Sequence, residues 1–227
     1  MPWLEHARIY SKRRPTPKRE LTTMELHLIR HGQTNWNEER RSQGQSESVL
    51  TKLGIQQAKA LGEKIGEIGF DQVYCSSSVR TRQTAEHAFA GRPELHQKII
   101  YLDSFREIFL GPWEGVLYDE IEKEDPESFQ HFWQQPHLFA VKGAETFLEL
   151  QSRAVLQIQE IGKAQQSKKI AIVSHGALIK SVLCHAQERP LEELWAPPTM
   201  HNCAHSIVQY NDDFKPKIIQ YADSPMS

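Results

Sequence analysis

Cysteine is scarce in this chain, and long apolar runs are missing from it. The 227 residues include three cysteines, Cys75, Cys184 and Cys203, which lie far apart and form no CxxC pair. This odd, dispersed set argues against a disulfide framework and a cysteine-based metal site, and it favours free thiols in a reducing compartment. No stretch of 18 apolar residues occurs, so no segment is expected to span a membrane. We therefore expect a cytoplasmic protein.

The chain also lacks an excess of charge of either sign. It carries 27 Lys and Arg residues against 29 Asp and Glu residues, a formal net charge of −2 with its 11 histidines counted neutral. A balance near zero argues against a general nucleic-acid-binding protein, whose surface would be basic. Hydrophobic residues make up 39% of the chain and charged residues 25%, which is typical of a globular protein. A chain of this length can bury a core of its own.

The first 23 residues differ from the rest in charge and in pattern. They contain six basic and two acidic residues, a net charge of +4, so the remainder carries a net charge of −6. They show no sustained periodicity and no apolar stretch of the kind found in signal peptides. We expect residues 1–23 to form a disordered basic arm. Two alternatives stay open: that translation begins at Met24, or that the arm binds nucleic acid, which nothing downstream supports.

From residue 24 onward, short apolar strands alternate with amphipathic helices. The predicted strands are rich in apolar and β-branched residues and span residues 25–30, 72–75, 99–102, 169–173, 206–210 and 217–221. The predicted helices carry apolar residues on one face and span residues 53–68, 78–90, a long stretch after Gly143, and 176–186. This alternation predicts an α/β sandwich formed by a single domain over residues 24–227.

Residues 105–147 depart from this alternation because they are rich in aromatic side chains. They hold nine of the chain's 20 Phe, Trp and Tyr residues. We expect a helical lobe at about residues 104–142, packed on one end of the sheet. These rings have two alternative functions: they pack the core of the lobe, or they form a wall over a ligand, since ligand pockets are lined mainly by apolar groups.

Two His-Gly dipeptides each follow a predicted strand. His31-Gly32 comes after residues 25–30, and His175-Gly176 comes after residues 169–173. In open α/β sheets, ligands gather at the carboxyl ends of the strands, so both histidines are expected at one edge of the sheet. His175 also opens a predicted helix, whose free N–H groups favour an anion.

Two arginines in similar positions indicate that this anion is a phosphate. Arg30 directly precedes His31, and Arg80 follows the predicted strand at residues 72–75, near a helix start. The planar fork of arginine donates two parallel hydrogen bonds to a phosphate group. Each of these residues has an ordinary structural explanation when taken alone, and only their convergence indicates a site.

A phosphate site becomes an enzyme only with a nucleophile and a proton donor. A neutral imidazole nitrogen of His31 can attack phosphorus, provided that the other ring nitrogen carries the proton and meets an acceptor. Glu107 is our candidate for protonating the leaving group, since like-charge repulsion from a bound phosphate keeps a nearby carboxyl protonated. The residues alone do not select Glu107 from the other glutamates.

These residues belong to motifs that resemble the signature of the histidine phosphatase superfamily, also called the phosphoglycerate mutase-like family. The resemblance covers roughly residues 25–221, in the family's order and spacing, and it is greatest to the broad-specificity phosphatases, on residues 125–139 and 194–198. The matching motifs are Arg30-His31-Gly32-Gln33-Thr34 with Asn37, Arg41-Ser42-Gln43-Gly44, Leu50-Thr51-x-x-Gly54, Ser76-Ser77-x-x-Arg80-x-x-Gln83-Thr84-Ala85, Arg106-Glu107-x-x-x-Gly111-x-Trp113-Glu114-Gly115, Gly143-Ala144-Glu145-Thr146 and Ser174-His175-Gly176.

The resemblance implies a three-layer α/β/α sandwich with a mixed, mostly parallel sheet and an inserted helical lobe. It implies that His31 is phosphorylated, and that Glu107 is first the acid for the leaving group and then the base that activates water. It implies neither a metal nor an organic cofactor. The residues implied to bind the phosphoryl group or to lie at its mouth are Arg30, Asn37, Gln43, Arg80, His175 and Gly176.

The function implied is hydrolysis of small phosphate monoesters through a phosphohistidine. The first alternative is a 2,3-bisphosphoglycerate-dependent phosphoglycerate mutase, although such mutases usually have longer lobes and an Arg-x-Tyr-Gly segment where this chain has residues 108–113. Further alternatives are a phosphatase of narrow specificity and a non-catalytic phospho-ligand sensor, which would have no need of Glu107. The partner expected is a small phosphate ester, with no nucleic acid or membrane, and we assign no oligomeric state. Glu47, Val49, Pro112 and His205 depart from the family pattern without removing a catalytic group.

Overall fold

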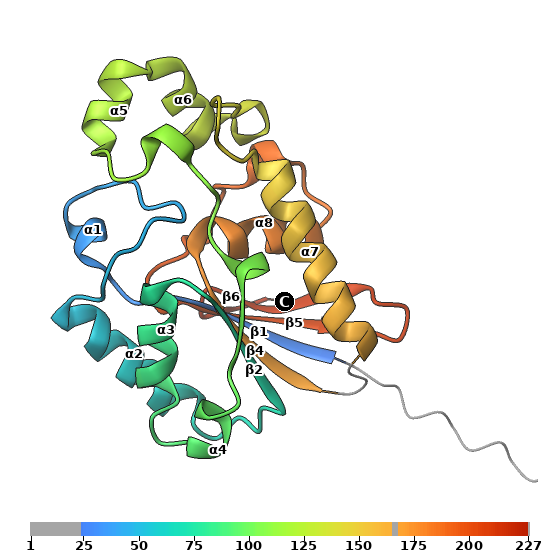
Figure 1. The fold of residues 1–227 in the computed structure, drawn as a ribbon. Helices are drawn as coiled ribbons and strands as arrows, with labels where there is room; N and C mark the ends of the chain where they lie inside the picture. Colours follow the sequence, from blue (N-terminus) through green and yellow to red (C-terminus); the bar gives the residue numbers. More distant parts are fainter. Residues whose placement is uncertain (1–23, 165–167, 227) are drawn as a thin grey trace, which may run out of the picture.

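Seven strands form one mixed sheet within the residues described by the structure, a computed structural model that covers residues 24–164 and 168–226. The predicted arm at residues 1–23 lies outside the described residues. The order across the sheet is β3-β2-β4-β1-β5-β6-β7 (Figure 1). The strands are β1 (Met24–Arg30), β2 (Gln72–Ser76), β3 (Ile100–Leu102), β4 (Lys169–Ser174), β5 (His205–Tyr210), β6 (Pro216–Tyr221) and β7 (Ser224–Pro225).

Strands β3, β2, β4 and β1 run parallel, and β5, β6 and β7 continue the sheet in antiparallel pairs. Arg30, the last residue of β1, is in register with Ser174, the last residue of β4. The parallel strands therefore end at the same edge of the sheet, as the two His-Gly dipeptides predicted. The last two predicted strands, at residues 206–210 and 217–221, are also present, as the antiparallel pair β5 and β6.

Alternate side chains of the central strands enter two different cores. In β4, Ile170 and Ile172 pack on the side of α7 (Phe147–Ala164) and α8 (Gly176–Ala186). Ala171 and Val173 pack on the opposite side, against α2 (Lys52–Ile65) and α3 (Val79–Ala88). The sheet thus has helices on both faces, which confirms the predicted α/β/α sandwich (Figure 1).

Helix α2 shows how the local sequence sets an element's ends. The hydroxyl of Thr51 caps its start by accepting from the backbone nitrogen of Gly54 at 3.0 Å. Its buried side chains, Ala58, Leu61 and Ile65, have the predicted helical spacing. The helix ends at Ile65, so Ile68, which we expected on the same helical face, lies in the following turn and packs partly buried against the same core.

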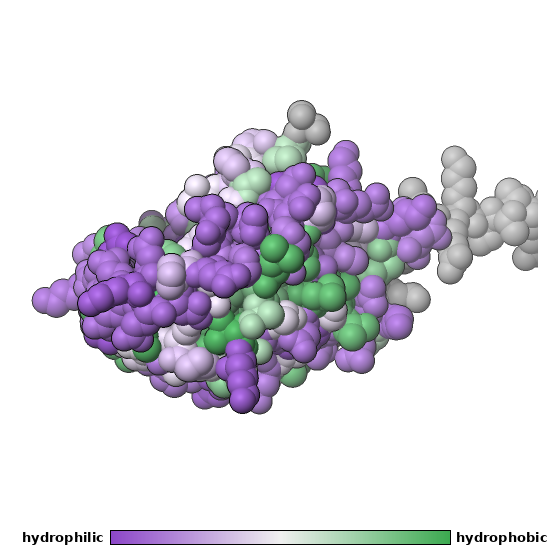
Figure 2. Space-filling view, turned by 90° about the horizontal axis from the view of Figure 1, so that it is seen from above, coloured by the Kyte–Doolittle hydropathy of each residue, from purple (hydrophilic) through white to green (hydrophobic). Residues whose placement is uncertain are grey.

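A lobe built from α5 (Tyr118–Glu124) and α6 (Pro126–Gln134) stands beyond one end of the sheet (Figure 1). Aromatic rings form its interior, and Trp113 and Phe132 both lie 5.2 Å from Phe139, centroid to centroid. Seen from the lobe end, apolar side chains gather in the middle of a largely hydrophilic face (Figure 2). The remaining short helices are α1 (Asn35–Glu38), α4 (Pro93–His96) and 3₁₀ turns at Asp103–Phe105, Gly111–Trp113, Pro136–Leu138 and Leu191–Glu193. In the described part of the chain, every helix is too short or too polar to cross a membrane.

Candidate active site

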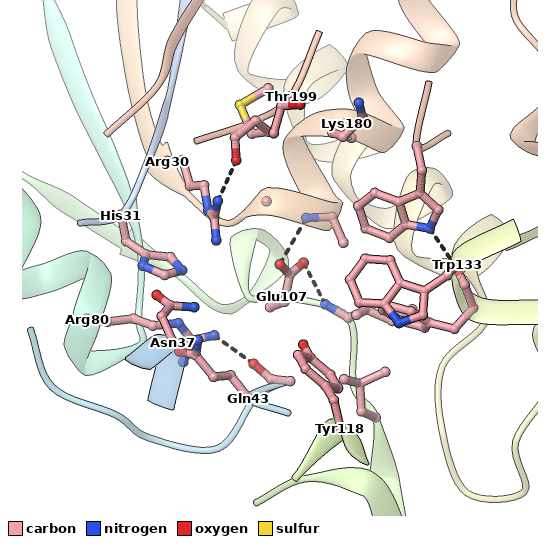
Figure 3. A pocket seen from close by; sticks show the side chains of 18 residues that line it. Arg30, His31, Asn37, Gln43, Arg80, Glu107, Tyr118, Trp133, Lys180 and Thr199 are labelled. Atoms are coloured by element: carbon pink, nitrogen blue, oxygen red, sulfur yellow. Dashed lines mark hydrogen bonds between the residues drawn. The ribbon is translucent and has the colours of Figure 1, made fainter. Parts of the chain in front are cut away.

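A cavity of about 420 Å³ lies at the carboxyl edge of the parallel strands. Its walls come from the ends of the strands, from the first turns of α8 and from the lobe (Figure 3). The structure therefore brings together most of the residues that the sequence predicted. Those that line the cavity are Arg30, His31, Asn37, Gln43, Arg80, Glu107 and Gly176.

His31 is buried, and its ring has one assignable tautomer. Its Nδ1 atom lies 2.8 Å from the carbonyl oxygen of Gly32, so Nδ1 carries the hydrogen and Nε2 keeps a free lone pair. Burial and the charges of Arg80 and Arg30 lower the pKa of His31 well below its usual value, so the ring is neutral at neutral pH. This is the state required of a nucleophile.

Glycine at position 32 allows the turn after β1 to approach α2 closely. A Cβ atom on Gly32 would lie 2.6 Å from the carbonyl oxygen of Gly54, and one on Gly54 would lie 2.0 Å from that of Gln33. Both contacts are with backbone, which cannot give way cheaply. The glycines of two separate motifs therefore serve one purpose, which is to seat the turn that carries His31.

One nitrogen of the Arg30 guanidinium donates to the backbone, and another has no hydrogen-bond partner. Its Nη1 atom donates to the carbonyl of Met200, whereas its Nε atom is buried without a hydrogen-bond partner. A Cβ atom on Gly176 would lie 3.3 Å from this Nε, so glycine at 176 leaves room beside it. A buried N–H without a partner is costly, and an anion in the cavity would satisfy it.

Arg80 connects the cavity to the loop at residues 42–48. Its Nη1 and Nη2 atoms donate to the carbonyls of Ser46 (2.9 Å) and Gly44 (2.7 Å), and its Nε donates to Nδ1 of His175 (3.2 Å). Burial lowers its pKa to about 10, which leaves it charged at neutral pH. Arg80 therefore fixes the loop while it contributes positive charge to the cavity.

His175 lies behind Arg80 and is not part of the cavity wall. Its Nε2 atom is 2.8 Å from the hydroxyl of Ser76, and its Nδ1 accepts from Arg80, so the hydrogen is on Nε2. The ring centroids of His175 and His31 are 5.4 Å apart. The two histidines therefore converge as predicted, but this His175 ring orients Arg80, and its direct contact with a phosphoryl group stays a prediction.

Asn37 and Gln43 both have their carbonyl oxygens occupied by protein donors. The Oδ1 atom of Asn37 accepts from the backbone of Thr34 at 3.1 Å and from Nδ2 of Asn202 at 3.4 Å. The Oε1 atom of Gln43 accepts from the hydroxyls of Thr34 (3.1 Å) and Ser48 (2.7 Å). The amide nitrogens of both side chains are thus left as donors for a ligand in the cavity.

The carboxylate of Glu107 binds the start of α8, where the sequence predicted that the phosphate anion would bind. Its Oε1 accepts from the backbone nitrogens of Ile108 and Leu178, and its Oε2 accepts from that of Ala177, each at 3.0 Å. The carboxylate is thereby fixed at the positive end of the helix while it faces the cavity (Figure 3). This geometry distinguishes Glu107 from the other glutamates, which the sequence alone could not do.

Comparison with known proteins gives the family. Residues 26–223 match the model of the histidine phosphatase superfamily, branch 1. The chain belongs to this superfamily. Phosphoserine phosphatase 1 of Hydrogenobacter thermophilus is 27% identical, over 83% of this chain and 88% of that protein. The metal-independent phosphoserine phosphatase of Arabidopsis thaliana is 30% identical, over 73% of this chain and 69% of that protein.

Among solved structures, that of Bacillus stearothermophilus YhfR is similar, with a TM-score of 0.83 and 38% identity. The match covers 88% of this chain and 97% of that one. These findings confirm the resemblance read from the motifs, and the family and the phosphatase relatives identify the chain as a phosphomonoesterase. In the described ranges, His, Cys, Asp and Glu side chains form no group of three that could hold a metal ion.

The cavity of this phosphatase has a second part that the sequence analysis did not assign residue by residue. Tyr118, Phe132 and Trp133 of the lobe line it together with Trp195, whose ring centroid is 5.2 Å from that of Trp133. The expected aromatic wall is therefore present for these rings, whereas Trp113 and Phe139 pack the lobe's core. Lys180, Thr199 and Met200 also line the cavity and lie outside every motif, so no sequence signal pointed to them.

Proposed function

We propose that this phosphomonoesterase hydrolyses small phosphate monoesters through a phosphohistidine formed on Nε2 of His31. The observation that carries the proposal is the hydrogen bond from Nδ1 of His31 to the carbonyl of Gly32. It holds the proton on Nδ1, so the lone pair of Nε2 is free, and the lowered pKa of the ring keeps it so at neutral pH. The binding partner that we propose for this site is its substrate, a small phosphate ester.

Positive charge and amide donors would hold the phosphoryl oxygens. Arg30 offers its unpartnered Nε, Arg80 offers charge fixed by its carbonyl contacts, and Asn37 and Gln43 offer amide N–H groups. Preorganised donors of this kind stabilise the charge that develops as phosphorus is transferred. His175 supports the set through Arg80.

Glu107 would donate a proton in the first half-reaction and accept one in the second. As Nε2 of His31 bonds to phosphorus, the ester P–O bond breaks and the leaving oxygen takes the proton of Glu107. Glu107 then accepts a proton from water as the water oxygen bonds to phosphorus and the P–N bond breaks. Backbone donors stabilise the carboxylate, whereas a bound phosphoryl group repels it, so we expect Glu107 to gain its proton as substrate binds.

The aromatic wall suits leaving groups that are partly apolar. Trp133, Trp195 and Tyr118 surround the part of the cavity that lies beyond the phosphoryl site.

We also propose that the enzyme acts in the cytoplasm, since Cys75 and Cys184 are buried free thiols, as expected in a reducing compartment.

Rapid quenching with ³²P-labelled p-nitrophenyl phosphate tests the proposal. Quenching in alkaline detergent should leave label on the wild-type protein, since the P–N bond of phosphohistidine survives alkali. His31→Ala should lose the label and at least about a thousandfold of turnover, because the nucleophile is gone. His185→Ala, which changes an exposed histidine of α8, is the control. Wild-type turnover in His31→Ala would contradict the mechanism.

The mutase alternative is tested with 3-phosphoglycerate. Release of inorganic phosphate supports hydrolysis, whereas formation of 2-phosphoglycerate would mean that the phosphoenzyme is intercepted by the product. Phosphate binding without turnover of any ester in a broad panel would instead identify a phospho-ligand sensor.

A further inference from the structure

Lys180 is a buried cation that the proposed reaction does not use. It lies on α8, one turn after Gly176, and 3% of the residue is exposed. Its Nζ atom donates to the carbonyl oxygens of Ala196 (2.6 Å) and Pro198 (3.1 Å) and lies 5.5 Å from the ring centroid of Tyr221. In the part of the chain that the structure describes, no carboxylate forms an ion pair with it.

Both carbonyls belong to residues 195–204, which we call the strap, and the strap continues directly to the active site. The carbonyl of Met200 accepts from Nη1 of Arg30. Nδ2 of Asn202 lies 3.3 Å from the carbonyl oxygen of His31 and 3.4 Å from Oδ1 of Asn37. The backbone nitrogen of Cys203 donates to the same carbonyl of His31 at 3.2 Å. One segment therefore contacts three residues of the proposed phosphate site.

The strap has no regular secondary structure between Trp195 and Ala204 to fix its path. The carbonyls of Thr199 and His201 accept from backbone nitrogens within the strap, but other carbonyls must find donors elsewhere in the fold. Lys180 supplies two of these hydrogen bonds. Burial and the charge of Arg189 lower the pKa of Lys180 to about 8, which shows that its charged form is held at a cost. In some proteins, a buried charge of this kind specifies one arrangement of the chain around it.

The orientation of Lys180 argues against direct contact with the phosphoryl group. Figure 3 shows its ammonium nitrogen pointing away from Glu107, whereas its side chain stays beside the cavity. We propose that Lys180 is a positioning residue, which fixes the strap through the carbonyls of Ala196 and Pro198 so that the strap fixes Arg30, His31 and Asn37. The inference rests on the proposed function, since it assigns these residues to the phosphate site.

A double-mutant cycle between Lys180 and Asn202 tests this coupling. Lys180→Met keeps an unbranched side chain of similar length without the charge, and Asn202→Ala removes the side-chain contacts of the strap with His31 and Asn37. The dissociation constant for inorganic phosphate is measured by calorimetry, together with kcat and KM for p-nitrophenyl phosphate and the melting temperature. Lys163→Met, on the exposed end of α7, is the matched control.

Each single variant should weaken phosphate binding by about tenfold, and the double variant should be little weaker than the more damaging single one, because both act through the same strap. The melting temperature of Lys180→Met should fall only modestly, because removal of a buried charge offsets part of the cost of leaving the carbonyls of Ala196 and Pro198 without this donor. If Lys180→Met fails to fold, Lys180→Gln replaces it in the double-mutant cycle with Asn202→Ala. Glutamine keeps a hydrogen-bond donor without the charge.

Two results would overturn the proposal. One is additive losses in the double variant, which would mean that Lys180 acts independently of Asn202. The other is unchanged phosphate affinity in Lys180→Met with a selective loss of phosphoserine over p-nitrophenyl phosphate, which would make Lys180 a direct ligand of an anionic leaving group. Because phosphate binding is measured without turnover, a wild-type protein that binds phosphate but hydrolyses nothing would contradict only the proposed function.

Discussion

His205 on β5 donates a hydrogen bond to His27 on β1, with Nε2 of His205 lying 2.8 Å from Nδ1 of His27. The direction follows from the outer contacts of the two rings. Nε2 of His27 is 3.0 Å from the Glu25 carboxylate and so carries a hydrogen, which leaves its Nδ1 as the acceptor. The amide nitrogen of Gln220 approaches Nδ1 of His205 at 3.5 Å, in keeping with an acceptor there. Both histidines are therefore neutral in the folded protein.

This pair should make the fold sensitive to acid. Burial lowers the pKa of His205 to about 4, whereas an unfolded histidine titrates near 6.5. As the pH falls from 6.5 towards 4, the unfolded state takes up a proton that the folded state refuses, so stability falls by up to about 3 kcal/mol. His205→Ser, which removes the imidazole and keeps a small polar side chain, should shrink the difference in urea-unfolding free energy between pH 8 and pH 5.

The control for this prediction is His185→Ser, which alters an exposed histidine and should leave the pH difference as in the wild type. A pH difference that is equally large in His205→Ser would show that other groups cause the acid sensitivity. His27 is then the first candidate, because burial lowers its pKa as well.

The sequence predicts those parts of the site whose position depends on strand ends. His31 and Arg30 end a strand with a clear apolar pattern, and parallel strands must end at one edge, so their convergence with Arg80 follows from pattern alone. Glu107 is different, because its place at the start of α8 depends on the path of a loop. That path is set by backbone donors which no side-chain pattern encodes.

Contacts made by irregular segments are the part that the sequence could not predict. Lys180 occurs in an apolar helix that reads as core, and the carbonyls that hold it lie 16 and 18 positions further along the chain. The expectation that α8 binds the anion with its own N–H groups was reasonable from the dipole, but it could not foresee that Glu107 takes those donors. Which acceptor binds a given backbone N–H group depends on the three-dimensional arrangement of all the acceptors near it.

Ser76 should prove to be a positioning residue that acts through His175. Its hydroxyl lies 2.8 Å from Nε2 of His175 and favours the tautomer whose Nδ1 accepts from Arg80. Ser76→Ala should let the ring adopt the other tautomer, which turns an N–H towards the Nε–H of Arg80. We expect kcat/KM for p-nitrophenyl phosphate to fall about tenfold as the guanidinium shifts. Ser77→Ala removes the neighbouring, half-buried hydroxyl, which donates to Asp103 and does not contact His175, and it should retain wild-type kinetics. Equal kinetics in both variants would count against the tautomer argument.

Trp133 should contribute to binding of the leaving group and not to the chemical step. Its ring lines the cavity at 5.8 Å from Tyr118 and 5.2 Å from Trp195, centroid to centroid. Trp133→Ala should raise KM for aryl phosphates about tenfold and change kcat little, because the lost stacking favours ground state and transition state alike. Steady-state kinetics on p-nitrophenyl phosphate and phosphoserine check this, with phosphoserine affected less. Leu138→Ala removes an exposed lobe side chain outside the cavity as a control; a fall in kcat alone in Trp133→Ala would refute the assignment.

The pH dependence of kcat for a substrate with a basic leaving group, such as phosphoserine, should be bell-shaped. The acid limb reports His31, which must be neutral to attack, and burial places its pKa well below 6.5. Activity is therefore retained as the pH falls through 6.5 and is lost only in more acidic solution. The alkaline limb reports loss of the proton that the leaving group needs. Saturating rates from pH 4 to 9 at constant ionic strength check this. An acid limb centred at or above pH 6.5, or a flat profile, would contradict the pairing of a neutral nucleophile with a proton donor.

Glu107→Gln should separate the two half-reactions. Glutamine keeps the shape of the side chain, but it neither donates the proton to a leaving group nor activates water. p-Nitrophenolate leaves without protonation, so the variant should release one equivalent of it per site in a burst and then turn over at least about a hundredfold more slowly than the wild type. Phosphoserine needs the acid and should give no burst. Stopped-flow absorbance and ³²P retention measure both phases, with Glu160→Gln, at an exposed position of α7, as the control. A Glu107→Gln variant that hydrolyses phosphoserine at the wild-type rate would show that another group moves the proton.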